Sequence, residues 1–124
     1  MKTKNQKKEL VIGKHVYGNL YNCKKDLLFD ENFLINLIKE ACKISNSTLI
    51  KIISHKFGNL GVSVVGIIAE SHISIHTWPE YEYATLDVYT CGKNANPEKA
   101  FDFIVERLKP KKFTKHIVDR SLIK

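Results

Sequence analysis

Residues 72–78 alternate strictly between two kinds of side chain, and this pattern constrains the fold more than any other feature of the sequence. The odd-numbered positions carry isoleucine, isoleucine and threonine, whereas the even-numbered positions carry histidine, serine, histidine and tryptophan. Successive side chains of a β-strand point to opposite faces of the sheet. The segment therefore predicts a strand that buries one face and presents chemically active groups on the other.

The remaining sequence predicts one α+β domain over residues 1–124. Asp30 can cap a first helix that ends near Ser45, and Asn96-Pro97 starts a second helix that ends before Pro110. Segments rich in β-branched and aromatic residues predict further strands, over 10–21, 48–57, 62–69, 83–91 and 113–118. Adjacent strands joined by tight turns favour an antiparallel sheet with two helices packed on one face.

Composition argues against a membrane or secreted protein. No apolar run approaches the roughly 20 residues that a membrane-spanning helix needs. The N-terminal segment, residues 1–8, has no hydrophobic stretch behind it and does not resemble a secretory signal. The chain has three cysteines, an odd number, and no two of them lie close together in the sequence. This predicts reduced thiols and a cytoplasmic location.

The net charge of +7 comes largely from lysines in two segments, Lys2–Lys8 and Lys109–Lys115. Neither segment carries a glycine-and-aromatic strand motif or a helix-turn-helix, which are typical of nucleic-acid-binding domains. We therefore expect both basic ends to be solvated, and residues 1–8 to form a flexible arm. No nucleic-acid or membrane partner is expected.

The polar residues could suggest a metal site or a hydrolase. His72 and His76 with Glu80 look like a ligand set, but on a strand the two histidines lie about 13 Å apart. That is too far to share a zinc ion, whose bonds to nitrogen are about 2 Å long, so no metal is expected. The Gly-x-Ser-x-Gly elbow of serine hydrolases is absent. A thiol enzyme built on Cys91-Gly92 and a histidine from elsewhere stays open, although such a motif is weak.

Two blocks of the sequence closely resemble the prokaryotic type of S-adenosylmethionine decarboxylase, a small pyruvoyl-dependent enzyme. They are residues 69–80 (AESHISIHTWPE) and residues 87–92 (DVYTCG). The resemblance continues in His55-Lys56-Phe57, Gly61-Val62-Ser63, Pro97-Glu98-Lys99-Ala100 and Leu108-Lys109-Pro110, and it covers most of residues 10–120. A sandwich fold like that of the family is therefore expected.

The resemblance implies a zymogen that cleaves itself between Glu70 and Ser71. The products would be a β chain of residues 1–70 and an α chain of residues 71–124. Ser71 would become a self-generated pyruvoyl cofactor, which forms a Schiff base with the substrate and accepts electrons as CO2 leaves. The family's product is decarboxylated S-adenosylmethionine, the aminopropyl donor for spermidine and polyamine biosynthesis.

The family's other roles fall on matching positions of this chain. His76 resembles the processing base, and Ser63 resembles a residue that assists processing. Cys91 resembles the general acid that protonates the substrate carbon. The positions that resemble substrate-binding residues are the rings that sandwich adenine, Phe57 and Trp78, and the acid that binds ribose, Glu80.

The expected hairpin geometry assigns these residues to two different sites. If Trp78 faces Tyr83 across the turn, Cys91 lies beside Ser71. His76 lies about 16 Å along the strand from Ser71, on the opposite face. One subunit therefore cannot easily bring both together, and the resemblance implies a homodimer of αβ protomers with shared active sites.

Two alternatives to this function stay open. Relatives with the same scaffold decarboxylate arginine or ornithine, and their self-processing block can look the same. An unprocessed, non-catalytic homologue could act as a regulator or binding module, but the intact Glu70-Ser71, His76 and Cys91 argue against it.

Overall fold

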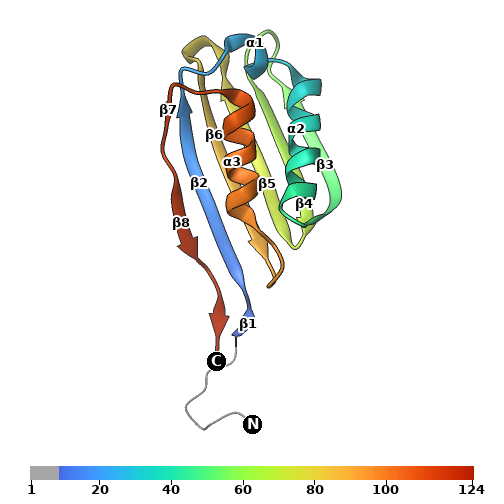
Figure 1. Ribbon diagram of the computed structural model, residues 1–124. Coiled ribbons are helices and arrows are strands. Elements are labelled where there is room, and N and C mark those ends of the chain that lie inside the picture. Colours follow the sequence, from blue (N-terminus) through green and yellow to red (C-terminus); the bar gives the residue numbers. More distant parts are fainter. Residues whose placement is uncertain (1–8) are drawn as a thin grey trace.

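The chain folds into an antiparallel sheet with its helices on one face (Figure 1). The computed structural model describes residues 9–124, and the basic arm expected over residues 1–8 lies outside them. Within the described residues the sheet has the strand order β3-β4-β5-β6-β2-β7. Strand β8 also pairs directly with β2, at residues that β7 does not reach. The strands are β2 (Gly13–Tyr21), β3 (Thr48–Lys56), β4 (Val62–Ala69), β5 (Ser71–Trp78), β6 (Tyr83–Cys91), β7 (Lys112–Phe113) and β8 (His116–Asp119).

Two long helices cover one face of this sheet, as the sequence predicts. Helix α2 (Glu31–Ile44) begins at Asp30, whose carboxylate accepts a hydrogen bond from the Phe33 backbone N–H at 3.0 Å. Helix α3 (Pro97–Leu108) begins in the same way at Asn96. Such caps satisfy N–H groups that the first helical turn leaves unpaired.

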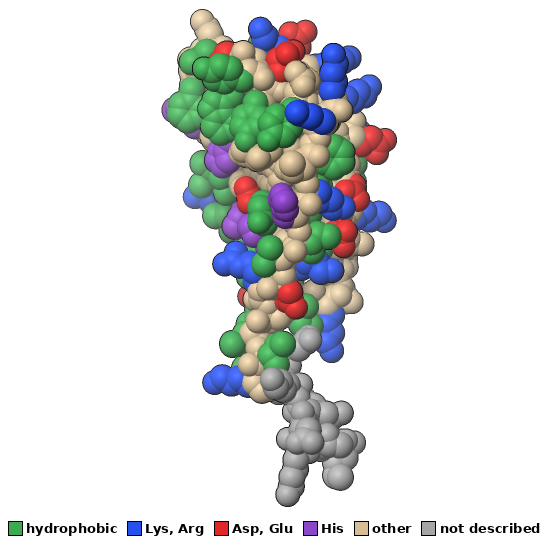
Figure 2. All heavy atoms as spheres, turned by 90° about the vertical axis from the view of Figure 1, so that its left-hand side faces the viewer, with side chains coloured by type: hydrophobic (Ala, Val, Ile, Leu, Met, Phe, Trp, Pro, Cys, Tyr) green, Lys and Arg blue, Asp and Glu red, His purple; other side chains and the backbone are tan. Residues whose placement is uncertain are grey.

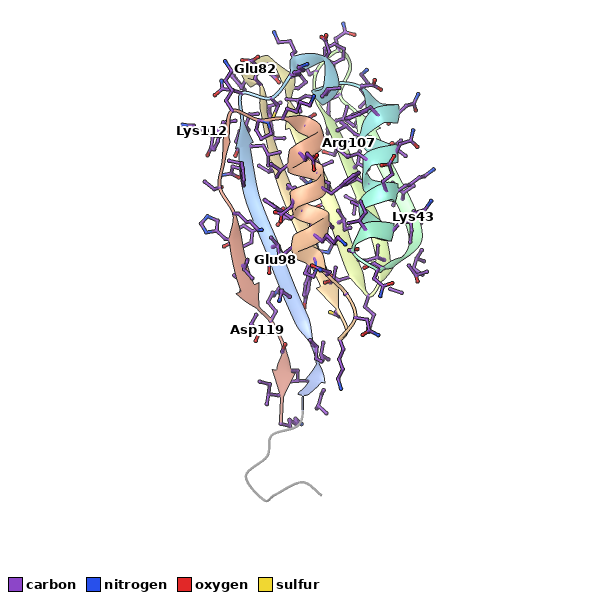
Figure 3. All side chains as sticks on the ribbon, viewed as in Figure 1. Lys43, Glu82, Glu98, Arg107, Lys112 and Asp119 are labelled. Carbon is purple, nitrogen blue, oxygen red and sulfur yellow. The ribbon has the colours of Figure 1, made fainter. Side chains whose placement is uncertain are left out.

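The hydrophobic core lies between the helices and the sheet. The residues in it are fully buried and come from the inward faces of α2, α3 and the central strands: Leu34, Ile38, Phe101, Ile104, Val16, Ile73, Ile75, Leu86 and Val88. Charged side chains such as Lys43 of α2 and Arg107 of α3 stay on the outer helix surface (Figure 3). Arg107 lies 3.8 Å from Glu40 of α2. Ile73 and Ile75 of β5 are buried, as the alternation of residues 72–78 predicts.

Several boundaries differ from the sequence-based expectation. The first strand is split: β1 (Glu9–Val11) pairs with β9 (Leu122–Ile123), and only β2 joins the main sheet. A short helix α1 (Lys25–Leu28) and a 3-10 turn η1 (Pro79–Tyr81) were not expected as helical segments.

The closing strand expected over 113–118 is also broken into two pieces. At the break, Thr114 and Asn19 exchange two hydrogen bonds of 2.9 Å. A Cβ at Gly18 would lie 1.9 Å from the Thr114 carbonyl oxygen. The chain at Thr114 therefore packs closely against β2 and does not continue the regular hydrogen-bond pattern of a strand.

The face of the sheet opposite the helices is uncovered. Figure 2 looks onto the β7–β8 edge and shows a hydrophobic patch at the upper left with histidines beside and below it. The even-numbered side chains of β5 point to this open face, as do those of the odd-numbered positions of β6. His72, His76 and Trp78 of β5 and Cys91 of β6 therefore lie on one open face.

Candidate active site

The β5–β6 hairpin has the register expected from the sequence. Trp78 pairs with Tyr83, and Ser71 pairs with Thr90. The Cys91 backbone N–H donates a hydrogen bond of 3.2 Å to the Glu70 carbonyl oxygen. Cys91 therefore lies beside the Glu70–Ser71 junction, as predicted.

The junction itself has unusual backbone geometry. Ser71 has a φ of +105°, a region that residues other than glycine rarely adopt and that costs on the order of 1–3 kcal/mol. Its hydroxyl lies 3.4 Å from Nδ1 of His72. A pocket of about 260 Å³ adjoins the junction and is lined by Leu10, Val11, Ile12, Glu70, Cys91, Gly92 and Lys93.

A second pocket of about 340 Å³ lies at the other end of β5. Ser63 of β4 pairs with His76 of β5, and the Ser63 hydroxyl lies 2.7 Å from Nδ1 of His76. The lining residues are Phe57, Leu60, Gly61, Ser63, His76, Thr77, Trp78 and Glu80. The family resemblance assigns two of these residues to processing and three to substrate binding. All five therefore line one pocket: Ser63, His76, Phe57, Trp78 and Glu80.

Phe57 and Trp78 place two aromatic rings in the wall of this second pocket. Phe57 is 53% exposed and Trp78 is 39% exposed, so both rings present a free surface. The Trp78 ring lies 5.5 Å from that of Tyr83. Such exposed rings beside a carboxylate suit a flat, cationic ligand.

The two pockets have no lining residue in common. Among the described residues, the side-chain hydrogen bond of Ser71 goes to His72 and that of His76 goes to Ser63. No hydrogen bond joins Ser71 to His76 within residues 9–124. One chain therefore holds the two groups of candidate residues at opposite ends of the same strand.

The sequence did not predict a cluster of rings that lies between the two pockets. His15 Nε2 lies 2.9 Å from the Asp87 carboxylate, and the rings of His15 and His72 lie 5.7 and 6.1 Å from that of Tyr89. Burial lowers the pKa of His72, with Asp87 opposing that shift. Asp87, Tyr89 and Cys91 alternate along β6 with residues that are buried on its other face. This alternation in the sequence could have indicated that the three side chains share the open face.

The three cysteines differ in their surroundings. Cys23 and Cys42 are buried, and burial raises the pKa of each thiol to about 11. Cys91 is partly exposed and lines the junction pocket. Since the thiolate is the reactive form, Cys91 is the accessible thiol of the three.

No group of three or more histidine, cysteine, aspartate or glutamate side chains is placed to hold a metal ion in residues 9–124. No helix in the same part of the chain is long and apolar enough to cross a membrane.

Comparison with known proteins gives consistent matches. The family model described as S-adenosylmethionine decarboxylase matches residues 14–121. The S-adenosylmethionine decarboxylase proenzyme of Pyrobaculum islandicum is 55% identical over 116 residues, which cover 93% of each chain. The arginine decarboxylase proenzyme of Hyperthermus butylicus is 51% identical over 117 residues, which cover 93% of this chain and 82% of that protein.

A solved structure agrees with these sequence matches. The crystal structure of the adenosylmethionine decarboxylase from Aquifex aeolicus superposes with a TM-score of 0.84 at 36% identity. The match covers 92% of this chain and 94% of that chain. The similarity therefore extends over nearly the whole fold.

Proposed function

The chain belongs to the S-adenosylmethionine decarboxylase family, and from this premise we propose that it is a proenzyme that matures into a pyruvoyl-dependent decarboxylase of S-adenosylmethionine. The observation that carries the proposal is the division of β5. One end holds Ser71 and Cys91 beside a small pocket, and the other end holds a bonded Ser63–His76 pair beside exposed rings.

Self-cleavage would begin with Ser71. Its hydroxyl attacks the Glu70 carbonyl, so the peptide bond breaks and an ester forms. A base then removes the Ser71 Cα proton, the Glu70 carboxylate leaves, and water converts the resulting dehydroalanine into a pyruvoyl group and ammonia. The positive φ of Ser71 supports this step, because cleavage would release the strain held at the junction.

The surroundings of Ser71 fit the group that would form there. Ser71 is half-buried, and Cys91 lies beside the junction. The pyruvoyl carbonyl supplies an electron sink when the substrate loses CO2. Cys91 would then give a proton to the substrate carbon, a role that suits a partly exposed thiol within a pocket.

The second pocket would bind the nucleoside part of the substrate. Phe57 and Trp78 would enclose the adenine ring, and Glu80 would accept hydrogen bonds from the ribose hydroxyls. The positive sulfonium would lie near electron-rich ring faces, which is favourable. His76, oriented by Ser63, would act as the base in maturation.

A homodimer would combine the two half-sites. In a two-fold dimer the same patch of each protomer faces the other, so antiparallel β5 strands would bring the Ser71 end of one protomer to the His76 end of its partner. The open face offers apolar and aromatic side chains for such an interface, including Tyr17, Ile53, Ile67 and Trp78. The three unpaired thiols are compatible with a cytoplasmic location.

Arginine is the second candidate substrate, because an arginine decarboxylase proenzyme matches the chain almost as closely as the S-adenosylmethionine decarboxylase proenzymes do. Glu80 could bind a guanidinium group, which pairs well with carboxylates. The exposed rings of Phe57 and Trp78 favour the nucleoside instead, since arginine has no ring to stack between them.

The test is the mass of the purified protein followed by a substrate assay. Two chains, ending at Glu70 and beginning at Ser71 with a blocked amino end, support the proposal. A single species that stays uncleaved would contradict it. Release of labelled CO2 from S-adenosylmethionine, arginine and ornithine then identifies the substrate, and release from arginine alone would overturn the first choice.

A further inference from the structure

The ring of Tyr89 leans along the sheet toward Cys91. The two residues lie on the same face of β6, two positions apart, and the cross-strand partners of Tyr89 and Cys91 on β2 are His15 and Gly13. A Cβ built at Gly13 would nevertheless lie 3.0 Å from the Tyr89 hydroxyl oxygen. The hydroxyl therefore lies over Gly13, the cross-strand partner of Cys91, and not over His15, the partner of Tyr89.

The segment after β8 holds the ring in this place. The Arg120 guanidinium lies 4.6 Å from the centre of the Tyr89 ring, within the range of a cation–π interaction. The Arg120 backbone N–H donates a hydrogen bond of 2.8 Å to the Gly13 carbonyl oxygen. Arg120 directly follows Asp119, which marks the lower end of β8 in Figure 3.

The electrostatic surroundings agree with contact between the two side chains. The pKa of the Tyr89 hydroxyl is raised, first by burial and then by the nearby Cys91 side chain, while Arg120 opposes that shift. The His15 and His72 rings also lie near the Tyr89 ring, at 5.7 and 6.1 Å. The Cys91 thiol is thus among the groups that act on the Tyr89 hydroxyl.

We propose that Tyr89 is a positioning residue for Cys91: its hydroxyl directs the thiol at the substrate carbon and stabilises the thiolate that remains after proton transfer. Arg120 and Gly13 keep the Tyr89 ring over that thiol. This inference rests on the proposed function, since it concerns the proton that replaces CO2.

The direction of proton transfer decides between two products. A proton that moves from the thiol to the substrate carbon gives the amine, and the cofactor is restored. If the proton goes to the carbon derived from Ser71, the substrate nitrogen stays on the α chain. Water supplies the oxygen with which the substrate leaves as an aldehyde, and the α chain then begins with alanine. A misplaced thiol should therefore increase the fraction of chains that begin with alanine.

The main test compares Tyr89→Phe with Tyr21→Phe, a matched control that removes a hydroxyl from β2 at a residue that lines neither pocket. Purified enzymes are cleaved, incubated with S-adenosylmethionine, and analysed by mass spectrometry of the α chain. We expect normal cleavage in both, and a several-fold higher alanine fraction per turnover in Tyr89→Phe. Equal fractions in the two variants would overturn the proposal.

A second measurement does not need a mature enzyme. In the uncleavable Ser71→Ala background, alkylation reports on Cys91, since the other two thiols are buried. Loss of a net hydrogen bond to the thiolate should slow alkylation about 3- to 10-fold in Tyr89→Phe. Gly13→Ala, which pushes on the ring, and Arg120→Leu should act in the same direction.

The outcomes separate this inference from the proposed function. If the parent protein neither cleaves nor decarboxylates, the proposed function fails. If the parent works and Tyr89→Phe changes neither alkylation nor alanine formation, the positioning role fails alone. A Tyr89→Phe variant that loses cleavage but alkylates at the parental rate would also overturn it, because Tyr89 would then act in maturation.

Discussion

The two ends of β5 differ in how complete they are within one chain. At the His76 end, Ser63 lies 2.7 Å from the imidazole and an aromatic pocket is already formed. At the Ser71 end, the hydroxyl has a loose contact of 3.4 Å with His72, and the backbone is strained. The binding end is preorganised, while the reacting end lacks the group that would complete it.

This difference suggests a division of labour between subunits. Preorganised groups lower the cost of binding, so the aromatic pocket can be built in one chain. A junction that cuts itself needs a base that reaches the scissile residue, and His76 of the same chain is held at the far end of the strand. The asymmetry of β5 is therefore what a shared site would require.

The largest expected effect within this comparison is on Cys91. Cys91→Ser should leave cleavage intact and lower kcat by about 10²- to 10⁴-fold, the usual contribution of a positioned general acid. Chain masses and CO2 release measure the two steps separately. Cys42→Ala removes a thiol from the core and should keep both steps in the folded protein, so a similar loss there would contradict the role of Cys91.

A smaller effect is expected from Phe57 at the binding end. Phe57→Ala should lower kcat/KM for S-adenosylmethionine by roughly 10- to 100-fold, since stacking of a base on a ring contributes about 1–3 kcal/mol. Cleavage should continue. Phe113→Ala, which removes an exposed ring that lines neither pocket, is the control. An unchanged kcat/KM for Phe57→Ala would show that the adenine ring does not bind against Phe57.

The smallest effect concerns His72 at the reacting end. Its pKa is lowered mainly by burial, so the folded state binds a proton less readily than the unfolded state, whose histidines titrate near pH ~6.5. Stability should therefore fall as the pH drops below about 6.5. Thermal unfolding of Ser71→Ala with and without His72→Gln measures this, and an identical pH dependence in the two would show that His72 makes no contribution.

Much of the sheet could be predicted from the sequence because the signals are local. The alternation of residues 72–78 defined the faces of β5, and the turn after it predicted the register that sets Cys91 beside Ser71. Asp30 and Asn96 marked the helix starts through their caps. The residues that share the aromatic pocket came from a family resemblance and not from periodicity.

The parts that escaped prediction depend on contacts between distant segments. The break at Thr114 follows from its close approach to Gly18, and the pairing of β1 with β9 joins the two ends of the described chain. The position of Tyr89 depends on Arg120, which follows it by more than thirty residues. No local pattern encodes such contacts.

The central claim is that His76 of one protomer acts on Ser71 of the other. Ser71→Ala and His76→Ala chains, distinguished by mass, should each stay uncleaved when produced alone. When they are coexpressed in equal amounts, random pairing into two-fold dimers should allow cleavage of about half of the His76→Ala chains and of no Ser71→Ala chain. If dimers that contain both chains form and the His76→Ala chain still remains intact, the shared site does not exist.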